Sequence, residues 1–299
     1  MSAVQEVVTE AAVVEAAPKK AMTLGYGTSL VMLALLILVP LFVKNFIIFQ
    51  LTMLLIYALA VLALNILTGG SGQFSLGQSA FYAVGAYTSA ILMEHAGINS
   101  AVTLPIAGVV CFAFGFLFGQ PALRLSGVYL ALATFALATA MPQLLKLGYF
   151  EYWTGGVQGL VVDKPDAPFG LPMSQDMWLY YFTLAVSVAI YIFSVNLLKS
   201  RSGRAFMAIR DNEIAASAMG IDVALYKTLA FGVSAGITGV AGALGAIAVQ
   251  FVAPDRPFEI PSAMFGTKIM NAEPTIDPGS QPTPPTTMPR NSEIASVMV

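Results

Sequence analysis

The sequence contains little charge. Lysine, arginine, aspartate and glutamate make up 10% of its 299 residues, whereas a soluble globular domain carries about 25%. Hydrophobic residues reach 57% and the mean hydropathy is +0.78. These values exclude an ordinary soluble domain and predict a protein that crosses the membrane several times, with membrane lipid around it. The net charge is −2 and no basic stripe carries interleaved aromatics, so we expect no nucleic-acid partner.

Residues that carry catalytic or metal chemistry are equally scarce. There is one cysteine, Cys111, and one histidine, His95. A single cysteine excludes an internal disulfide, and a single histidine beside Glu94 lacks the further ligands that a metal site needs. No nucleophile–base pair stands out, and no GxxxxGK[ST] phosphate loop occurs. We therefore expect that this chain is no enzyme and holds neither a metal nor a cofactor.

Long uncharged runs fill most of the chain. A membrane-spanning helix needs about 20 mostly apolar residues. The run from Asn45 to Met93 is long enough for two such helices, and it breaks at Gly69–Gln73, where glycine favours a turn. The runs predict an all-α fold, a polytopic transmembrane helix bundle of about seven spans. The expected spans are 25–43, 46–68, 73–93, 99–120, 126–145, 177–198 and 228–252.

The charges in the loops predict the side of the membrane on which each loop lies. Lysine and arginine favour the cytoplasm, and loop 199–227 is rich in both. We place this loop inside, together with a flexible N-terminal tail over 1–24. The loop 146–176 has more acids than lysines and has aromatic residues at both borders, which predicts an external position. Seven spans then leave the C-terminal tail external.

Two of the expected spans, 73–93 and 228–252, are rich in small residues. Gly232 and Gly236 have the GxxxG spacing. Small side chains let helices pack closely in lipid, but they also leave room for a solute, so helix packing and a translocation path both stay open. The candidates for either role are Gly72, Gln73, Ser75, Gly85, Tyr87, Gly232 and Gly236. The spans contain no acid, lysine or arginine, which argues against a proton relay and weakens sodium coupling without excluding it.

The loop 199–227 has the pattern of short helices. From Phe206 onward, its apolar residues recur at spacings of three and four, as on a helix with one apolar face. Asp211 and Asn212 can cap the start of a second short helix, and Gly220 can end it. Such a helix pair suits docking into a groove of a soluble partner, although an interfacial helix resting on lipid has the same pattern.

Four stretches together resemble one family of transport proteins. They are GRAFMAIRDNEIAASAMGID at 203–222, LNILTGGSGQFSLGQSAFYAVGAYTSAIL at 64–92, LRLSGVYLALATFALA at 123–138 and TGGVQGL at 154–160. Over roughly residues 45–255, the chain resembles the LivM-type permease subunit of branched-chain amino acid ABC importers. The motifs are specific for the family and less so for the solute, because urea and amide permeases share the pattern.

The resemblance implies a permease domain over 25–253 in the bacterial plasma (inner) membrane, with a translocation path for branched-chain or related amino acids. It implies ABC ATPase subunits, which bind the ATP and dock on a coupling helix in loop 199–227. The coupling residues would be Arg210, Asp211, Asn212, Glu213, Ala215, Ala216 and Gly220. It also implies a second, LivH-like permease subunit and an external solute-binding protein, which would face Thr154, Gly155 and Gly156.

The end of the chain departs from the family. Nine of the 17 prolines lie between Pro254 and the last residue. They exclude a spanning helix there and predict a disordered, non-family tail over 254–299 in place of a closing helix. The interpretation that follows is a truncated or frame-shifted chain. Two other functions therefore stay open: a stand-alone secondary transporter or channel, and a truncated remnant of the permease that does not transport.

Overall fold

The computed structural model describes residues 26–122, 127–147, 149, 151–156, 158–162, 164–165 and 174–253. The expectations for the tails over 1–24 and 254–299 lie outside these described residues. All the structural statements below concern the described part of the chain.

Helices dominate the described residues, which confirms the predicted helical bundle. Five of them are long and apolar enough to cross a membrane. They are α3 (Asn45–Asn65) with its π-helical end η2 (Ile66–Gly70), α5 (Ser100–Ala122), α6 (Val128–Leu145), α8 (Gln175–Lys199) and α11 (Val223–Val249). Two further predicted spans are not both long and apolar enough to cross a membrane. Helix α2 (Tyr26–Leu38), which is followed by the short 3-10 helix η1 (Val39–Leu41), is shorter, and α4 (Gln78–Ala96) is long enough but more polar.

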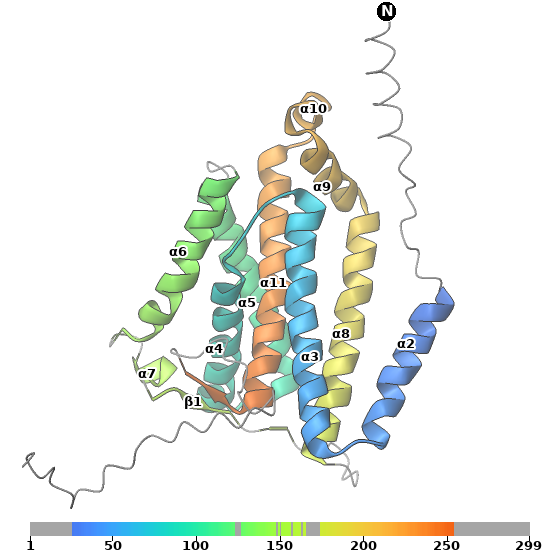
Figure 1. The fold of residues 1–299 in the computed structure, drawn as a ribbon. Helices are drawn as coiled ribbons and strands as arrows, with labels where there is room; N and C mark the ends of the chain where they lie inside the picture. Colours follow the sequence, from blue (N-terminus) through green and yellow to red (C-terminus); the bar gives the residue numbers. More distant parts are fainter. Residues whose placement is uncertain are drawn as a thin grey trace, which may run out of the picture. The chain divides into compact units, whose positions relative to one another are not determined.

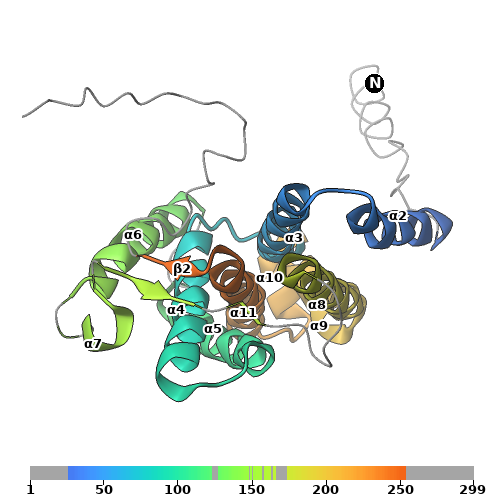
Figure 2. The same ribbon diagram turned by 90° about the horizontal axis from the view of Figure 1, so that it is seen from below.

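Helix α11 lies at the centre of the bundle, with α3 on one side and α4 and α5 on the other (Figures 1 and 2). Its 27 residues give a length of about 40 Å. Within its apolar 18-residue stretch, 89% is buried inside the protein. Small residues make this possible, because they allow neighbouring backbones to approach closely. A methyl group on Gly85 of α4 would overlap the carbonyl of Gly239 on α11, and one on Gly242 would overlap the carbonyl of Tyr82.

Helix α5 packs closely against α11 in the same way, on the same side as α4. A methyl group on Gly232 would lie 3.2 Å from the Phe112 ring, and one on Gly236 would lie 3.1 Å from the Gly108 carbonyl. Helix α3 is joined to α11 by a buried hydrogen bond, which Ser234 Oγ donates to the Ala63 carbonyl at 2.8 Å. The GxxxG pair of the sequence therefore lies in a contact between α5 and α11.

Short elements gather at the two ends of α11. Helices α9 (Arg201–Asp211) and α10 (Glu213–Ala218) precede its first residue. The strand β2 (Phe251–Val252) follows its last residue and pairs antiparallel with β1 (Leu160–Val161), close to the short helix α7 (Glu151–Thr154). Figure 1 shows the two groups at opposite ends of the bundle. The expected all-α fold therefore gains one small strand pair, in which a two-residue strand carries too little pattern to be recognised in the sequence.

The third expected span, 73–93, begins later than predicted. Helix α4 starts at Gln78, and the residues from Gly72 to Gly77 form neither helix nor strand. Their side chains alternate between buried and exposed, as in an extended stretch. Gly72 has φ +72°, a conformation that glycine adopts without strain and other residues avoid. This turn reverses the chain after η2 and ends the helical run.

The contact between α4 and α11 gives a first testable prediction. Gly85→Ala places a methyl group on the Gly239 backbone, and overpacking of this kind costs about 1–3 kcal/mol. At a free helix position the same change would stabilise the protein by about 1 kcal/mol. We therefore expect thermal unfolding of Gly85→Ala in detergent at a lower temperature than the unmodified chain.

Ala136→Val is the matched control, because it adds bulk at an exposed position of α6. It should leave the unfolding temperature close to that of the unmodified chain. An unchanged or higher unfolding temperature for Gly85→Ala would contradict the close α4–α11 contact.

Candidate functional site

The loop 199–227 folds into two short capped helices. Ser200 caps α9, where its side chain accepts a hydrogen bond from the Gly203 backbone N–H at 3.4 Å. Asn212 caps α10 by accepting from the Ala215 N–H at 3.0 Å. Gly220 follows the end of α10 with φ +82°. The predicted cap at Asn212 and the helix end at Gly220 are confirmed, since both residues have the conformation that a cap needs.

Helix α9 is amphipathic and rests on the bundle. Its buried side chains include Phe206 and Ile209, and the Phe206 ring packs edge-to-face against Tyr226 of α11 with ring centroids 6.2 Å apart. Phe206 also belongs to a buried cluster with Phe231 of α11 and Phe81 of α4. The apolar face expected from the sequence therefore packs against this chain.

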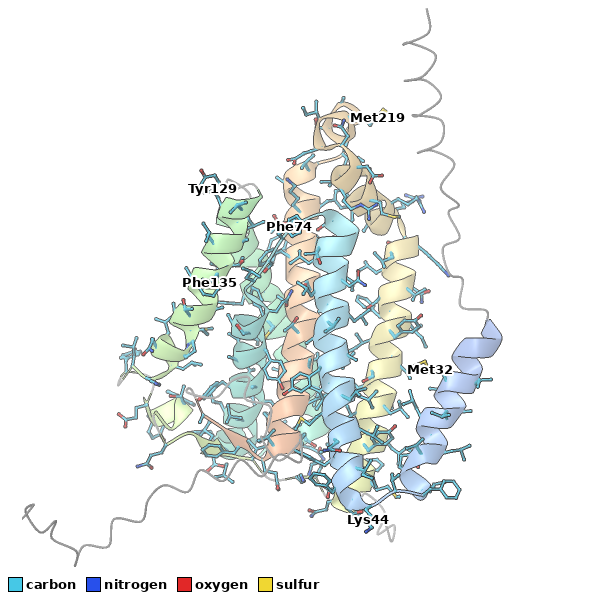
Figure 3. All side chains as sticks on the ribbon, in the orientation of Figure 1. Met32, Lys44, Phe74, Tyr129, Phe135 and Met219 are labelled. Carbon is cyan, nitrogen blue, oxygen red and sulfur yellow. The ribbon has the colours of Figure 1, made fainter. Side chains whose placement is uncertain are left out.

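Helix α10 presents large apolar side chains outward. Ile214 is 81% exposed and Met219, directly after the helix, is 85% exposed. Met219 lies at the tip of the bundle in Figure 3. Ala215 is exposed as well, but Ala216 is only 4% exposed. The outward surface thus differs from the predicted one: Ala216 faces the chain itself, and Ile214 and Met219 provide the exposed apolar area. We call these two residues the α10 tip.

An ion pair holds α10 to the start of α11. Lys227 Nζ lies 2.6 Å from Glu213 Oε2, with the Glu213 carboxylate more than half exposed. Exposed pairs of this kind contribute at most about 1 kcal/mol. The pair therefore orients α10 more than it stabilises the fold.

The remaining charged candidates lie on α9. Asp211 is the last residue of α9 and pairs with Arg210 at 3.3 Å, so it does not act as a cap. Arg210 also donates from Nη1 to the Gly69 carbonyl of η2 at 2.7 Å. A methyl group on Gly72 would lie 2.9 Å from Arg210 Cγ. Arg210 therefore contacts the point where η2 ends and the extended stretch begins.

The extended stretch, which we call the 72–77 segment, alternates between a polar inner side and an apolar outer side. Gln73 and Ser75 are buried, whereas Phe74 and Leu76 are 65% and 60% exposed. The Gln73 side-chain amide donates to the Lys227 carbonyl at 3.1 Å, next to the Lys227–Glu213 pair. Successive side chains of an extended chain point to opposite sides. The polar residues Gln73 and Ser75 therefore point inward, and the apolar residues Phe74 and Leu76 point outward.

The far end of this segment is held by α6 and α11. The Leu76 backbone N–H donates to Thr134 Oγ1 of α6 at 2.9 Å. Gln78, the first residue of α4, donates from its side-chain amide to Ser234 at 2.9 Å and accepts from Thr238 at 2.6 Å. The segment therefore runs from the level of Lys227 to that of Ser234 on α11, a descent of about 10 Å along the helix axis.

The opposite end of the bundle contains the TGG motif. Thr154 donates to the Leu145 carbonyl at 3.0 Å and accepts from the Gly156 N–H at 3.3 Å. Gly155 and Gly156 have φ +70° and +55°, which glycine tolerates best. Tyr87 and the α4 and α11 glycines lie inside the bundle between these two ends.

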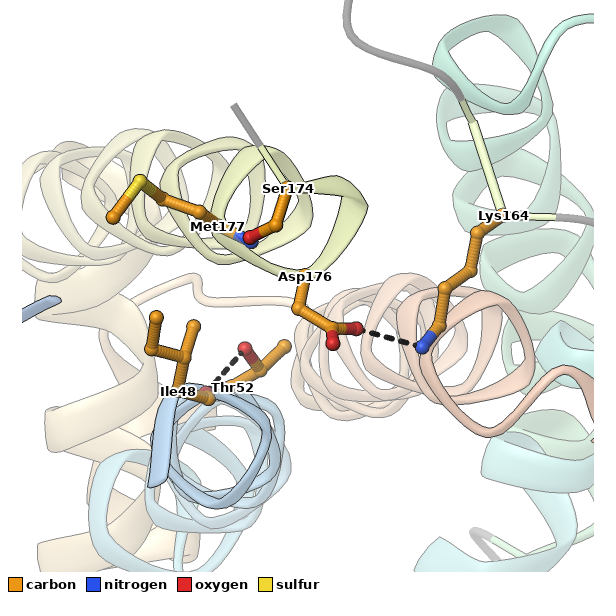
Figure 4. A network of polar contacts seen from close by, with 6 residues as sticks. All are labelled: Ile48, Thr52, Lys164, Ser174, Asp176 and Met177. Atoms are coloured by element: carbon orange, nitrogen blue, oxygen red, sulfur yellow. Dashed lines mark hydrogen bonds and ion pairs between the residues drawn. The ribbon is translucent and has the colours of Figure 1, made fainter. Parts of the chain in front are cut away.

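A second ion pair lies at this same end. Lys164 Nζ and Asp176 Oδ1 are 2.8 Å apart, which ties the loop to the start of α8 (Figure 4). Ser174 caps that helix by accepting from the Met177 N–H at 3.3 Å. The described residues contain no cluster of histidine, cysteine and acids able to hold a metal ion.

Comparison with known proteins places this sequence in a family. Residues 46–270 match the family described as "Branched-chain amino acid transport system / permease component". The match extends past Pro254, where the sequence alone suggested the start of a non-family tail. No solved structure matches the chain.

Three curated relatives support the match. The chain is 36% identical over 228 residues to the high-affinity branched-chain amino acid transport system permease protein LivM of Salmonella typhimurium, covering 68% of this chain and 53% of the relative. LivM of Escherichia coli gives the same identity and coverage. A probable LivM of Methanocaldococcus jannaschii is 26% identical over 140 residues, covering 46% of this chain and 39% of the relative. The chain spans about half the length of the Salmonella and Escherichia relatives. With most of its residues matched, the chain belongs to the family of branched-chain amino acid transport permease components.

Proposed function

We propose that this chain is the membrane-spanning permease subunit of an ABC importer in the bacterial inner membrane. Its cargo would be branched-chain or related amino acids, as the names of its relatives suggest. ATPase subunits, which bind and hydrolyse the ATP, dock on the α10 tip. A second permease subunit and an external solute-binding protein complete the assembly.

One observation carries the proposal for the ATPase. Ile214 and Met219 are large apolar side chains that stay exposed on a capped and ion-paired helix at the end of the bundle. A rigid helix with exposed apolar anchors and flanking charges suits a groove on a soluble protein. Large apolar anchors at the centre of an interface provide most of its binding energy.

The contacts behind α10 offer a route from the ATPase to the membrane domain. Glu213 holds Lys227, whose carbonyl accepts from Gln73. Arg210 on the neighbouring α9 holds the Gly69 carbonyl. A displacement of α9 and α10 would thus move the 72–77 segment. ATP can drive such a movement only if the contacts between the ATPase and the permease differ between the two states of the transporter.

The orientation follows from the charges at the α10 end. Five lysines and arginines lie in the loop 199–227, and a positively charged loop favours the cytoplasm. The ATPases act there as well. We therefore place α7, β1 and β2 on the external side, where the solute-binding protein would approach Thr154 and its neighbouring glycines.

Docking can be tested at the α10 tip. Met219→Asp and Ile214→Asp place a charge where an apolar contact is proposed, and burying an unpaired charge costs several kcal/mol. We expect each variant to reach the membrane at normal yield and to lose at least about tenfold of the co-purifying ATPase, since about 1.4 kcal/mol suffices for that factor.

Val161→Asp is the matched control, because Val161 is an exposed apolar residue at the opposite end of the bundle. It should retain the ATPase. Full co-purification of the ATPase with both α10 variants would rule out docking at this tip. Amino-acid uptake by the chain alone in liposomes, driven by an ion gradient, would favour a secondary transporter instead.

Arg210 provides a test of coupling. Arg210→Met removes the hydrogen bond to the Gly69 carbonyl while the α10 tip stays intact. We expect the ATPase to co-purify normally, with several-fold less uptake for each ATP hydrolysed. Arg201→Met, an exposed position on the same helix, should behave like the unmodified complex, and an unchanged uptake in Arg210→Met would argue against this route.

The orientation can be measured with single cysteines in a Cys111→Ala background. Tyr149 and Met219 are strongly exposed at opposite ends of the bundle. Tyr149→Cys should react with a membrane-impermeant thiol reagent in intact cells, whereas Met219→Cys should react only after the membrane is opened. The reverse pattern would invert the topology.

A further inference from the structure

The 72–77 segment leaves backbone hydrogen-bonding groups without partners. Its two ends are held: the Gly72 N–H donates to Thr68, the Gln73 N–H to Leu67, and the Leu76 N–H to Thr134. Within the described part of the chain, no hydrogen bond involves the N–H groups of Phe74 and Ser75 or the carbonyls from Gln73 to Leu76. No described residue therefore satisfies these groups.

Lipid tails cannot provide hydrogen bonds for these backbone groups. The segment descends about 10 Å along α11 from the level of Lys227, and at that depth hydrocarbon offers no hydrogen bonds. Non-helical backbone is tolerated inside a membrane only where protein buries it or where it lines a water-filled cavity. The polar side of the segment is buried against α11, but Phe74 and Leu76 on the other side remain exposed. Figure 3 shows Phe74 between α6 and α3.

The exposed side chains of the segment and its unpaired backbone groups favour two different parts of a ligand. Phe74 and Leu76 favour an aliphatic group, which loses contact with water when it packs against them. The free N–H groups favour a carboxylate and the free carbonyls favour an ammonium group, because each carries the opposite partial charge. A helix of another protein satisfies its own backbone groups and would leave these unpaired. A small zwitterion with an aliphatic side chain satisfies both.

We propose that the 72–77 segment is a solute-contact site for aliphatic α-amino acids on the translocation path. The inference rests on the proposed function and adds the residues that touch the cargo. Phe74 and Leu76 contact the aliphatic side chain, and the free backbone groups between Gln73 and Leu76 contact the amino and carboxylate groups. No acid, lysine or arginine lies in the segment, so binding is weak and the solute can leave.

Thiol protection tests the site in the assembled complex. Phe74→Cys and Leu76→Cys are made in a Cys111→Ala background, reconstituted in nanodiscs with the ATPases, the second permease and the binding protein, and treated with a charged methanethiosulfonate reagent. Both cysteines should react. L-leucine at about four times its half-protecting concentration should slow the reaction about fivefold, since protection scales with one plus the ratio of ligand to its dissociation constant. L-aspartate should give no protection.

Arg201→Cys on α9 is the matched control, because Arg201 is exposed at the end of the bundle and lies outside the segment. L-leucine should leave its reactivity unchanged. Two positions are probed so that a loss of assembly at one leaves the other informative.

Three results would overturn the site. Reaction in the isolated chain but not in the complex would mean that the partner permease covers the segment. Reaction that L-leucine does not slow would mean that water alone lines it, and no reaction in either sample would mean that it faces lipid. The proposed function is tested separately by ATP-driven L-leucine uptake in the Cys111→Ala complex. If uptake occurs without protection, only the site is wrong, and if the complex shows no uptake, the function itself fails.

Discussion

A bilayer offers no hydrogen bonds to the protein inside it, and the arrangement of this chain follows from that constraint. Each N–H and carbonyl at membrane depth needs a partner in the protein or in water. The long helices satisfy their own backbones, and α11 adds side-chain bonds to its neighbours through Ser234 and Thr238. The 72–77 segment is the described stretch that departs from this rule at depth, so its surroundings have to be polar or wet.

The same constraint explains why α11 is built from small residues. Between helices in lipid, the hydrophobic effect offers little, and association relies on close van der Waals contact. Gly85 against Gly239, and Gly242 against the Tyr82 carbonyl, bring two backbones within that range. A single added methyl group overlaps backbone atoms, which cannot rotate away as a side chain can. These glycines therefore fix the position of α4 relative to α11, and α4 in turn fixes the end of the 72–77 segment through Gln78.

The sequence alone predicted the helical bundle, because an uncharged run of about 20 residues is typical of a membrane-spanning helix. It also predicted the cap at Asn212 and the end at Gly220, since both depend on local backbone chemistry. It missed the start of α4, because Gln73, Ser75 and Gly77 are also compatible with the polar face of a helix. Only contacts to distant residues, Lys227 and Thr134, favour an extended chain here. The family resemblance counted Ala216 among the coupling residues, whereas its side chain is 4% exposed. Helix α10 has only six residues, too few for periodicity to show which side is buried.

The contacts at the two ends of the 72–77 segment differ in strength, and this difference suits a moving part. At the α10 end, Arg210 makes one hydrogen bond to Gly69 and the Glu213–Lys227 pair is partly exposed, so each contributes about 1 kcal/mol. At the α11 end, Gln78 makes two partly buried hydrogen bonds, and close backbone contacts at the glycines of α4 and α11 hold the helix that follows it. A force applied at α10 therefore breaks the outer contacts before it disturbs the packing around α11. In the proposed importer, ATP hydrolysis can shift α9, α10 and the start of the segment, while α4 and α11 keep the far end in place. In that importer, Phe74 and Leu76 would lie between the end that α9 and α10 contact and the end that α4 and α11 hold, so a displacement of α10 would reach the proposed solute-contact site.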